Sequence, residues 1–196
     1  MSKILEKIEW STEEPRITEF VLDCPEIARA HRAGQFVIVI PREGGERIPL
    51  TVAAKDEAAG TINILFQEVG ASTMMLGALK KGDSVAHIAG PLGKPTHVEK
   101  FGTVVCIGGG IGIAPVHPIA KAMKDAGNRV ISILGARNKG LLIYEDRMKL
   151  ASSEVRITTD DGSYGRKGFV TDELKRIIEE ENIPVDMVVV IGPPIM

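Results

Sequence analysis

Apolar residues recur in two patterns along the 196-residue chain, and the pattern changes near residue 98. In the first half, short segments rich in Val, Ile, Thr and Phe alternate with turn-forming stretches, as in β-strands. The predicted strands are residues 2–10, 17–23, 35–40, 48–54, 61–67 and 83–89. With one helical stretch at 72–79, they predict a closed, six-stranded antiparallel β barrel that carries a capping helix.

In the second half, apolar runs alternate with helical stretches. The predicted strands are residues 103–107, 130–134, 155–158 and 187–191, and the predicted helices are 113–126, 144–150 and 169–181. This alternation predicts a parallel sheet of βαβ units, and strands without polar positions fit a sheet covered on both faces. The predicted fold is therefore a β barrel domain, residues 1–98, followed by an α/β domain, residues 99–196.

Charge and composition exclude several classes of partner. The net charge is −2, so no basic field favours nucleic acid or anionic lipid. The longest apolar run has five residues, too few to cross a bilayer, and the N-terminal ten residues lack a secretory signal. We expect a cytoplasmic protein with no nucleic-acid binding and no membrane insertion. Cys24 and Cys106 are too few for an iron–sulfur cluster, and no histidine spacing indicates a metal.

The strongest local motif is VVCIGGGIGIAP, residues 104–115, in which a buried strand meets a helix. Gly109, Gly110 and Gly112 would let the backbone turn tightly and approach a pyrophosphate at the helix N-terminus. The motif departs from GxGxxG because Ile113 occupies the third glycine position. The alternative interpretation is a tight strand-to-helix turn without a ligand.

Two motifs of the first half are compatible with phosphate binding. In RIPLT, residues 47–51, Arg47 could hold a pyrophosphate by a bidentate contact, and Thr51 could reach a flavin ring edge; alternatively Arg47 is a solvated surface charge. In VGAST, residues 69–73, Ser72 is either an ordinary N-cap or a phosphate ligand at a helix start.

The order and spacing of these motifs resemble the ferredoxin–NADP reductase superfamily over the whole chain. Within it, the chain looks similar to the electron-transfer subunit of dihydroorotate dehydrogenase and to the small subunit of NADH-dependent ferredoxin:NADP oxidoreductases. The motifs are GQF (34–36), RIPLT (47–51), VGAST (69–73), GPLG (90–93), GGGIGIAP (108–115), TDDGSYGRKG (159–168) and IGPP (191–194).

The resemblance implies an FAD-binding barrel followed by a nucleotide-binding domain. By position, Arg47 would contact the FAD pyrophosphate, Pro49 and Leu50 would lie beside the isoalloxazine, and Thr51 would lie near flavin N5 as the catalytic residue. Gly70, Ser72 and Thr73 would bind the pyrophosphate through the capping helix. The residues implied at the nicotinamide dinucleotide are Gly109, Gly110, Gly112, Asp160, Asp161 and Gly162.

The chain departs from the family pattern at three places. Pro49 stands where many members carry an aromatic residue, and Ile191 stands where many carry cysteine. The similar subunits also carry a four-cysteine [2Fe–2S] segment after GPP, whereas this sequence ends at Met196. Either the sequence is truncated or the cluster lies elsewhere.

The predicted function is hydride transfer between NAD(P)H and FAD, followed by electron transfer to an iron–sulfur centre, a larger redox subunit or a ferredoxin-type protein. The alternatives are a stand-alone NAD(P)H flavin reductase and a non-catalytic nucleotide-binding regulatory module. We expect NAD(H) rather than NADP(H), because Asp160 and Asp161 would repel a 2′-phosphate and because the resemblance to these subunits favours NADH. Four basic residues could instead form a site for the 2′-phosphate of NADP(H), namely Arg137, Lys139, Arg166 and Lys167.

Overall fold

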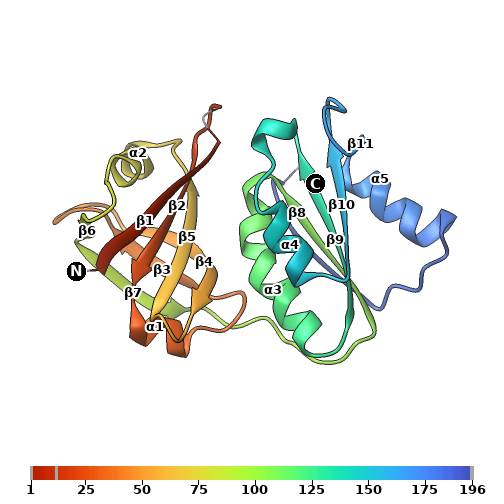
Figure 1. The fold of residues 1–196 in the computed structure, drawn as a ribbon, viewed down its shortest axis with the longest axis horizontal. Coiled ribbons are helices and arrows are strands. Elements are labelled where there is room, and N and C mark those ends of the chain that lie inside the picture. The colour runs from red at the N-terminus through yellow and green to blue at the C-terminus, as the bar shows by residue number, and fades with distance from the viewer. Residues whose placement is uncertain (1, 12, 195–196) are drawn as a thin grey trace. The chain divides into compact units, whose positions relative to one another are not determined.

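The computed structural model describes residues 2–11 and 13–194, and the chain divides into two compact units, Met1–Thr96 and His97–Met196 (Figure 1). The first unit is built on antiparallel strands and the second on parallel ones. Both sheet types follow from the change in apolar pattern along the chain. In the part of the chain described, no helix is long and apolar enough to cross a membrane.

The first unit is a nearly closed barrel of seven strands in the order β6-β1-β2-β5-β4-β3-β7. Its elements are β1 (Ser2–Ser11), β2 (Ile17–Asp23), α1 (Pro25–Ala30), β3 (Phe36–Ile40), β4 (Ile48–Asp56), β5 (Thr61–Gln67), α2 (Ala71–Gly77), β6 (Ser84–Val85) and β7 (His87–Leu92). The predicted antiparallel barrel is confirmed, but the predicted number of six strands is wrong. The predicted strand 83–89 is divided at Ala86, because its first part pairs with β1 and its second with β3.

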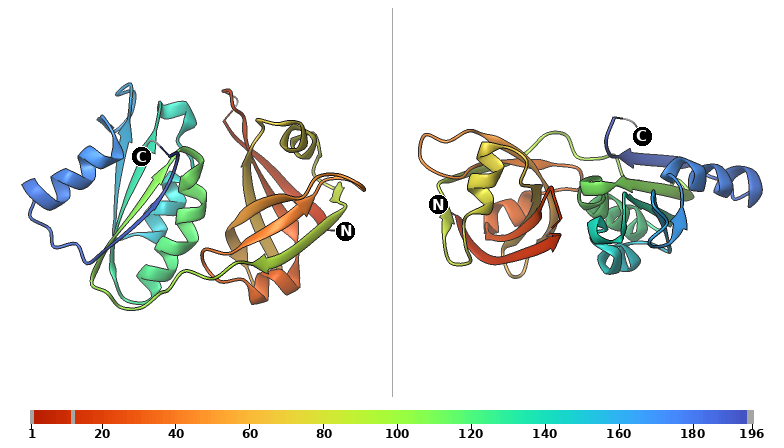
Figure 2. Two further views of the ribbon diagram at one scale, coloured as in Figure 1. Left: turned by 180° about the vertical axis from the view of Figure 1, so that it is seen from behind. Right: turned by 90° about the horizontal axis from the view of Figure 1, so that it is seen from above.

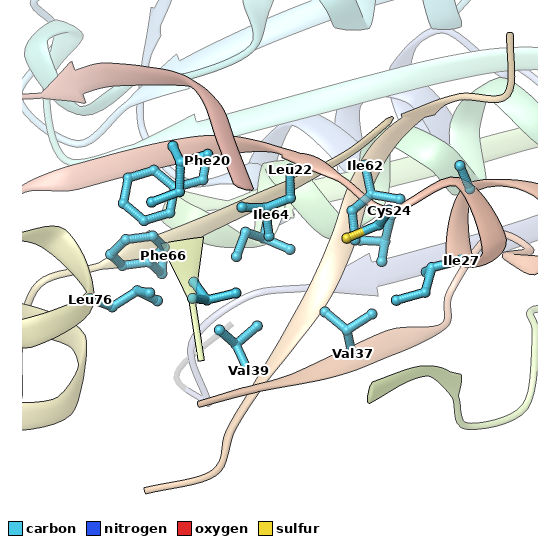
Figure 3. Close-up of a cluster of buried hydrophobic side chains, with 14 residues drawn as sticks. Phe20, Leu22, Cys24, Ile27, Val37, Val39, Ile62, Ile64, Phe66 and Leu76 are labelled. Carbon is cyan, nitrogen blue, oxygen red and sulfur yellow. The ribbon is translucent and has the colours of Figure 1, made fainter. Parts of the chain in front are cut away.

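The interior of the barrel is lined by alternate residues of its strands (Figure 3). Phe20 of β2 and Phe66 of β5 meet edge to face, with ring centroids 5.3 Å apart. Leu76 of α2 and Ile27 of α1 lie at opposite ends of this cluster. Helix α1 was not predicted, although Pro25 at its first turn is a typical helix start. Both helices therefore bury apolar side chains at the ends of the barrel core.

The second unit is a five-stranded parallel sheet in the order β11-β10-β9-β8-β12. Its elements are β8 (Thr103–Gly109), η1 (Gly110–Gly112), α3 (Ile113–Asp125), β9 (Arg129–Ala136), η2 (Lys139–Leu141), α4 (Glu145–Ala151), β10 (Glu154–Thr159), β11 (Arg166–Lys167), α5 (Val170–Lys175), the π-helical turn η3 (Arg176–Glu180) and β12 (Met187–Ile191). Strand order reverses at β8, which lies between β9 and β12. The short β11 was not predicted.

Helices cover both faces of this sheet, as predicted (Figure 2). Helix α3 packs on β8, β9 and β12, and α4 packs on α3 and β10, whereas α5 covers the other face over β9 and β10. Every residue of β8 is buried. On the α5 face, Val105 and Ile131 pack against Val170 and Ile177. Burial on both faces leaves the loops at the carboxyl ends of the strands as the exposed edge.

Candidate functional site

The barrel presents an arginine without a partner at the start of β4. Arg47 is exposed, and no hydrogen bond or ion pair joins it to any residue that the structure describes. Along β4, Ile48 and Leu50 pack against the barrel core, so the alternating positions Pro49 and Thr51 lie on the outer face. Leu50 therefore does not share a surface with Pro49 and Thr51 and could meet a ligand there only through its main chain.

Helix α2 begins differently from the sequence expectation. The N-cap is Gly70 rather than Ser72, and Ser72 is the second residue of the helix. The hydroxyl of Thr73, at the third helical position, accepts hydrogen bonds from the N–H groups of Val69 (3.1 Å) and Gly70 (3.0 Å). The Ser72 hydroxyl donates to the carboxylate of Glu46, in the loop before Arg47. The Thr73 hydroxyl thus holds the main chain of the loop that precedes α2. Nothing lies within 4 Å of a Cβ built on Gly70, so the space beside it is open.

The glycines of the loop after β8 differ in how much space surrounds them. Gly110 has φ +56°, which favours glycine, and nothing in the structure would meet a Cβ built on it. A Cβ on Gly112 would instead collide with the carbonyl of Ile191, and one on Gly108 would collide with the main chain of Ile113. Gly112 is therefore required for packing against β12, whereas Gly110 faces open space.

The acidic loop after β10 is tied to the end of β9. The N–H of Asp160 donates to Ala136 O (3.1 Å), and the N–H of Asp161 donates to Arg137 O (3.2 Å). The Asp161 carboxylate accepts the N–H of Ser163 (2.9 Å), and hydrogen bonds from Ser163 hold the pKa of Asp161 below its usual value. The Asp160 carboxylate is exposed and has no partner within the described part of the chain. Asp161 thus stabilises the loop, and Asp160 is available to a ligand.

Tyr164, at this edge, was not singled out from the sequence, and it contacts Lys139, which was considered there only as a basic residue near a 2′-phosphate. The Tyr164 hydroxyl donates to Glu145 (2.9 Å), and its main chain exchanges hydrogen bonds with the Thr159 hydroxyl. The Lys139 ammonium lies 5.1 Å from the centroid of the Tyr164 ring, and the Lys139 N–H donates to the Ser163 hydroxyl (2.9 Å). An aromatic residue inside TDDGSYG was the available signal, but a loop has no periodicity to interpret.

The carboxyl ends of β8, β9, β10 and β12 lie at one edge of the sheet, because the strands are parallel. The strand order reverses between β9 and β12 at β8, where Gly108 pairs with Ile191. Parallel sheets bind ligands in the crevice beyond the carboxyl ends at such a switch point. The structure therefore brings the glycine loop and the Asp160–Asp161–Gly162 loop to the edge expected for a nucleotide.

Known proteins share this architecture and sequence. Residues 106–196 match the family described as the oxidoreductase NAD-binding domain. The chain is 40% identical over 196 residues to the homolog of the dihydroorotate dehydrogenase B (NAD(+)) electron-transfer subunit from Thermotoga maritima, covering 100% of this chain and 67% of that protein. The chain belongs to the ferredoxin–NADP reductase superfamily. It spans about two thirds of the length of this relative.

Other comparisons agree with this membership. The electron-transfer subunit of dihydroorotate dehydrogenase B from Fusobacterium nucleatum is 35% identical over 82% of this chain and 63% of its own length. The solved structure of an NADH-dependent reduced ferredoxin–NADP oxidoreductase superposes with a TM-score of 0.92 and 36% identity, over 100% of this chain and 69% of that one. A cytochrome P450 reductase from Amycolatopsis, at 22% identity and a TM-score of 0.78, shares the fold.

As a ferredoxin–NADP reductase family member, the chain is an oxidoreductase that transfers electrons between NAD(P)H and FAD. The residues present fit both cofactors: Arg47 offers an unpaired guanidinium and Gly70 an open main chain, while Gly110 leaves room at the switch point. The two cysteines are free and buried. Burial raises the pKa of both thiols, that of Cys106 to about 12, and the cysteines lie in different units. No group of three or more metal-binding side chains occurs among residues 2–11 and 13–194.

Proposed function

We propose that the unit Met1–Thr96 binds FAD, that the unit His97–Met196 binds NADH, and that the chain is the electron-transfer subunit of a larger redox assembly. The observation that carries this proposal is Gly110, a glycine with positive φ that faces open space at the β8 switch point. Gly44, Gly82 and Gly127 share the positive φ and the open surroundings, so Gly110 is distinguished by its position at the carboxyl end of β8.

The proposed flavin site uses the outer face of β4 and the start of α2. Arg47 would hold the pyrophosphate by charge-assisted hydrogen bonds, and Gly70, Ser72 and Thr73 would border it. Pro49 would lie against the ring, and Thr51 would place its hydroxyl near N5. FAD supplies the redox chemistry, accepting a hydride and releasing electrons singly. The protein's task is alignment and exclusion of water, which is consistent with the lack of a general acid–base pair in the sequence.

For the nucleotide we propose a preference for NADH. Asp160 is the free carboxylate of its loop and could accept a hydrogen bond from a ribose hydroxyl, whereas it would repel a 2′-phosphate. The four basic residues nearby are differently placed. Lys139 lies against Tyr164, Lys167 packs over Gly162, and Arg166 lies 3.6 Å from Glu173. Arg137 also interacts within the structure.

For the electron acceptor we propose a larger redox subunit or a ferredoxin-type protein. The relatives in Fusobacterium and Thermotoga are named as electron-transfer subunits of dihydroorotate dehydrogenase B or as a homolog of one. The two buried cysteines cannot supply the four ligands of a [2Fe–2S] cluster. We therefore expect the electrons to leave towards a centre whose ligands are not in this sequence.

The test is a pair of measurements on the wild type and on Gly110→Val. The purified wild type should show flavin absorption, and that absorption should bleach when NADH is added without oxygen. A valine at Gly110 should block the pyrophosphate and strain the backbone, so we expect the flavin to stay bound while reduction by NADH is lost. Loss of both FAD binding and NADH reduction in this variant would contradict the assignment of one cofactor to each unit.

The same protein distinguishes the alternatives. A colourless protein that cannot be reconstituted with FAD would indicate a nucleotide-binding regulatory module. Rapid NADH oxidation with free flavin as the only acceptor would indicate a stand-alone flavin reductase. Turnover that requires a partner protein would support the electron-transfer subunit.

A further inference from the structure

A buried carboxylate behind the nucleotide edge has no role in the site described above. Glu173, on α5, has only 3% of its side chain exposed. Its Oε1 accepts hydrogen bonds from Arg156 (3.0 Å) and Arg176 (3.0 Å). Its Oε2 is buried and accepts no hydrogen bond. Burying a carboxylate oxygen without a hydrogen bond costs folding free energy unless a cation lies near it. The cation here is Arg166, whose Nη1 lies 3.6 Å from Oε2.

Arg166 connects this carboxylate to the acidic loop. It forms the short strand β11 with Lys167, directly after the loop, and pairs in register with Thr158. Thr158 lies on the α5 face, since a Cβ on its partner Gly135 would meet both Thr158 and Val170. Register partners point to the same side, so Arg166 points towards α5 and Lys167 towards the opposite face. There Lys167 packs over Gly162, with its Cβ 3.1 Å from the position of a Cβ on that glycine.

We propose that Glu173 is a positioning residue of the nucleotide site: through Arg166 it holds β11 against β10, and so fixes the Asp160–Gly162 loop on the opposite face of the sheet. The effect on nucleotide affinity rests on the proposed function, whereas the effect on the loop does not. The proposal also assigns Arg166 to the scaffold rather than to recognition of a 2′-phosphate.

The chain offers a matched control in Glu181. It bonds to the same two arginines as Glu173, through Arg156 (2.7 and 2.9 Å) and Arg176 (2.9 Å), but has no contact with Arg166 in the described structure. Glu173→Gln and Glu181→Gln each remove one charge from the same network and keep the side-chain size. Only the first removes the attraction to Arg166. The half-exposed Arg166 provides a third variant, Arg166→Ala, which leaves the arginine network itself intact.

The first measurement is hydrogen exchange of the full-length protein without nucleotide. In the wild type, the amides of Asp160, Asp161 and Gly168 are hydrogen-bonded to Ala136, Arg137 and Thr159. We expect faster exchange over residues 159–168 in Glu173→Gln and in Arg166→Ala, and wild-type exchange in Glu181→Gln. Unchanged exchange in Arg166→Ala, or equal acceleration in Glu173→Gln and Glu181→Gln, would overturn the proposal.

The second measurement is NAD⁺ affinity by calorimetry, with KM and kcat for NADH measured on the FAD-loaded enzyme. We expect about tenfold weaker NAD⁺ binding and a higher KM with unchanged kcat in Glu173→Gln and Arg166→Ala, and no further loss in the double variant. Glu181→Gln should bind as the wild type does, and additive losses in the double variant would refute the coupling. A wild type that binds no NAD⁺ would refute the proposed function, while the exchange data would still decide the role of Glu173.

Discussion

At the scale of single residues, a carboxylate in the proposed flavin site competes with the FAD pyrophosphate for a hydroxyl group. The Ser72 hydroxyl, which we assign to the FAD pyrophosphate, already donates to the carboxylate of Glu46. A phosphate cannot take that hydroxyl without displacing a like charge. We expect Glu46→Gln to tighten FAD binding about threefold to tenfold, because it removes repulsion at an exposed position. Flavin fluorescence titration measures this, with Glu43→Gln in the same loop as the control; weaker binding in Glu46→Gln would show that the carboxylate contributes to the site.

His31 makes the stability of the barrel depend on pH. The residue is 3% exposed, and neither ring nitrogen has a hydrogen-bond partner. Burial, followed by the charge of Lys55, lowers its pKa from 6.5 to about 4. The unfolded chain therefore takes up a proton at a higher pH than the folded one. The contribution of neutral His31 to the free energy of unfolding is therefore fully present above pH 6.5, and it is lost as the pH falls towards 4.

Urea unfolding at pH 7.5 and pH 5 tests this consequence. We expect the free energy of unfolding to fall by about 2 kcal/mol between the two values. His31→Leu, of similar volume and without a proton to bind, should remove the part of the pH dependence that His31 contributes. An equal pH dependence in both proteins would mean that His31 is not the group responsible.

At the scale of secondary-structure elements, Gly112 holds the contact between α3 and β12. A methyl group there would collide with the carbonyl of Ile191 and crowd Gly192. We expect Gly112→Ala to lower the free energy of unfolding of the second unit by about 2 kcal/mol, since a packed main chain must move. Gly112 has φ −61°, which any residue adopts, so crowding alone would act there. Gly127→Ala is the converse variant, because Gly127 has φ +86° and nothing within 4 Å of a Cβ. Unchanged stability in Gly112→Ala would contradict the close contact between α3 and β12.

At the scale of the whole molecule, each of the two units has buried apolar residues of its own, which predicts separate responses to ligands. The single tryptophan, Trp10, lies in β1 and donates to Glu19 (2.7 Å), so its fluorescence reports on the barrel. A ligand at 100 times its Kd stabilises the unit that binds it by about 2.7 kcal/mol. FAD should therefore raise the urea midpoint of the Trp10 transition, and NAD⁺ should not. A shift with NAD⁺ alone would reverse the assignment of the two units.

The sequence by itself predicted the two sheet types and the positions along the chain of the strands that carry the site. Alternating and continuous apolar runs differ in period, and the period depends only on local geometry. It also located the glycine loop and the acidic loop, because glycine and aspartate at strand ends are local signals. The resemblance to the reductase superfamily rested on seven such motifs in order, and the comparisons confirmed it.

The tertiary structure alone decided what depends on contacts between distant residues. The division of strand 83–89 at Ala86 follows from pairing with β1 on one side and β3 on the other. Gly110 and Gly112 are equivalent in the sequence, and they are distinguished only in the structure, by the positive φ of Gly110 and by the carbonyl of Ile191 beside Gly112. Arg166 and Lys167 are likewise neighbours with the same charge, yet they point to opposite faces of the sheet, towards Glu173 and Gly162. Burial and pairing are set by segments far apart in the chain, which no local pattern encodes.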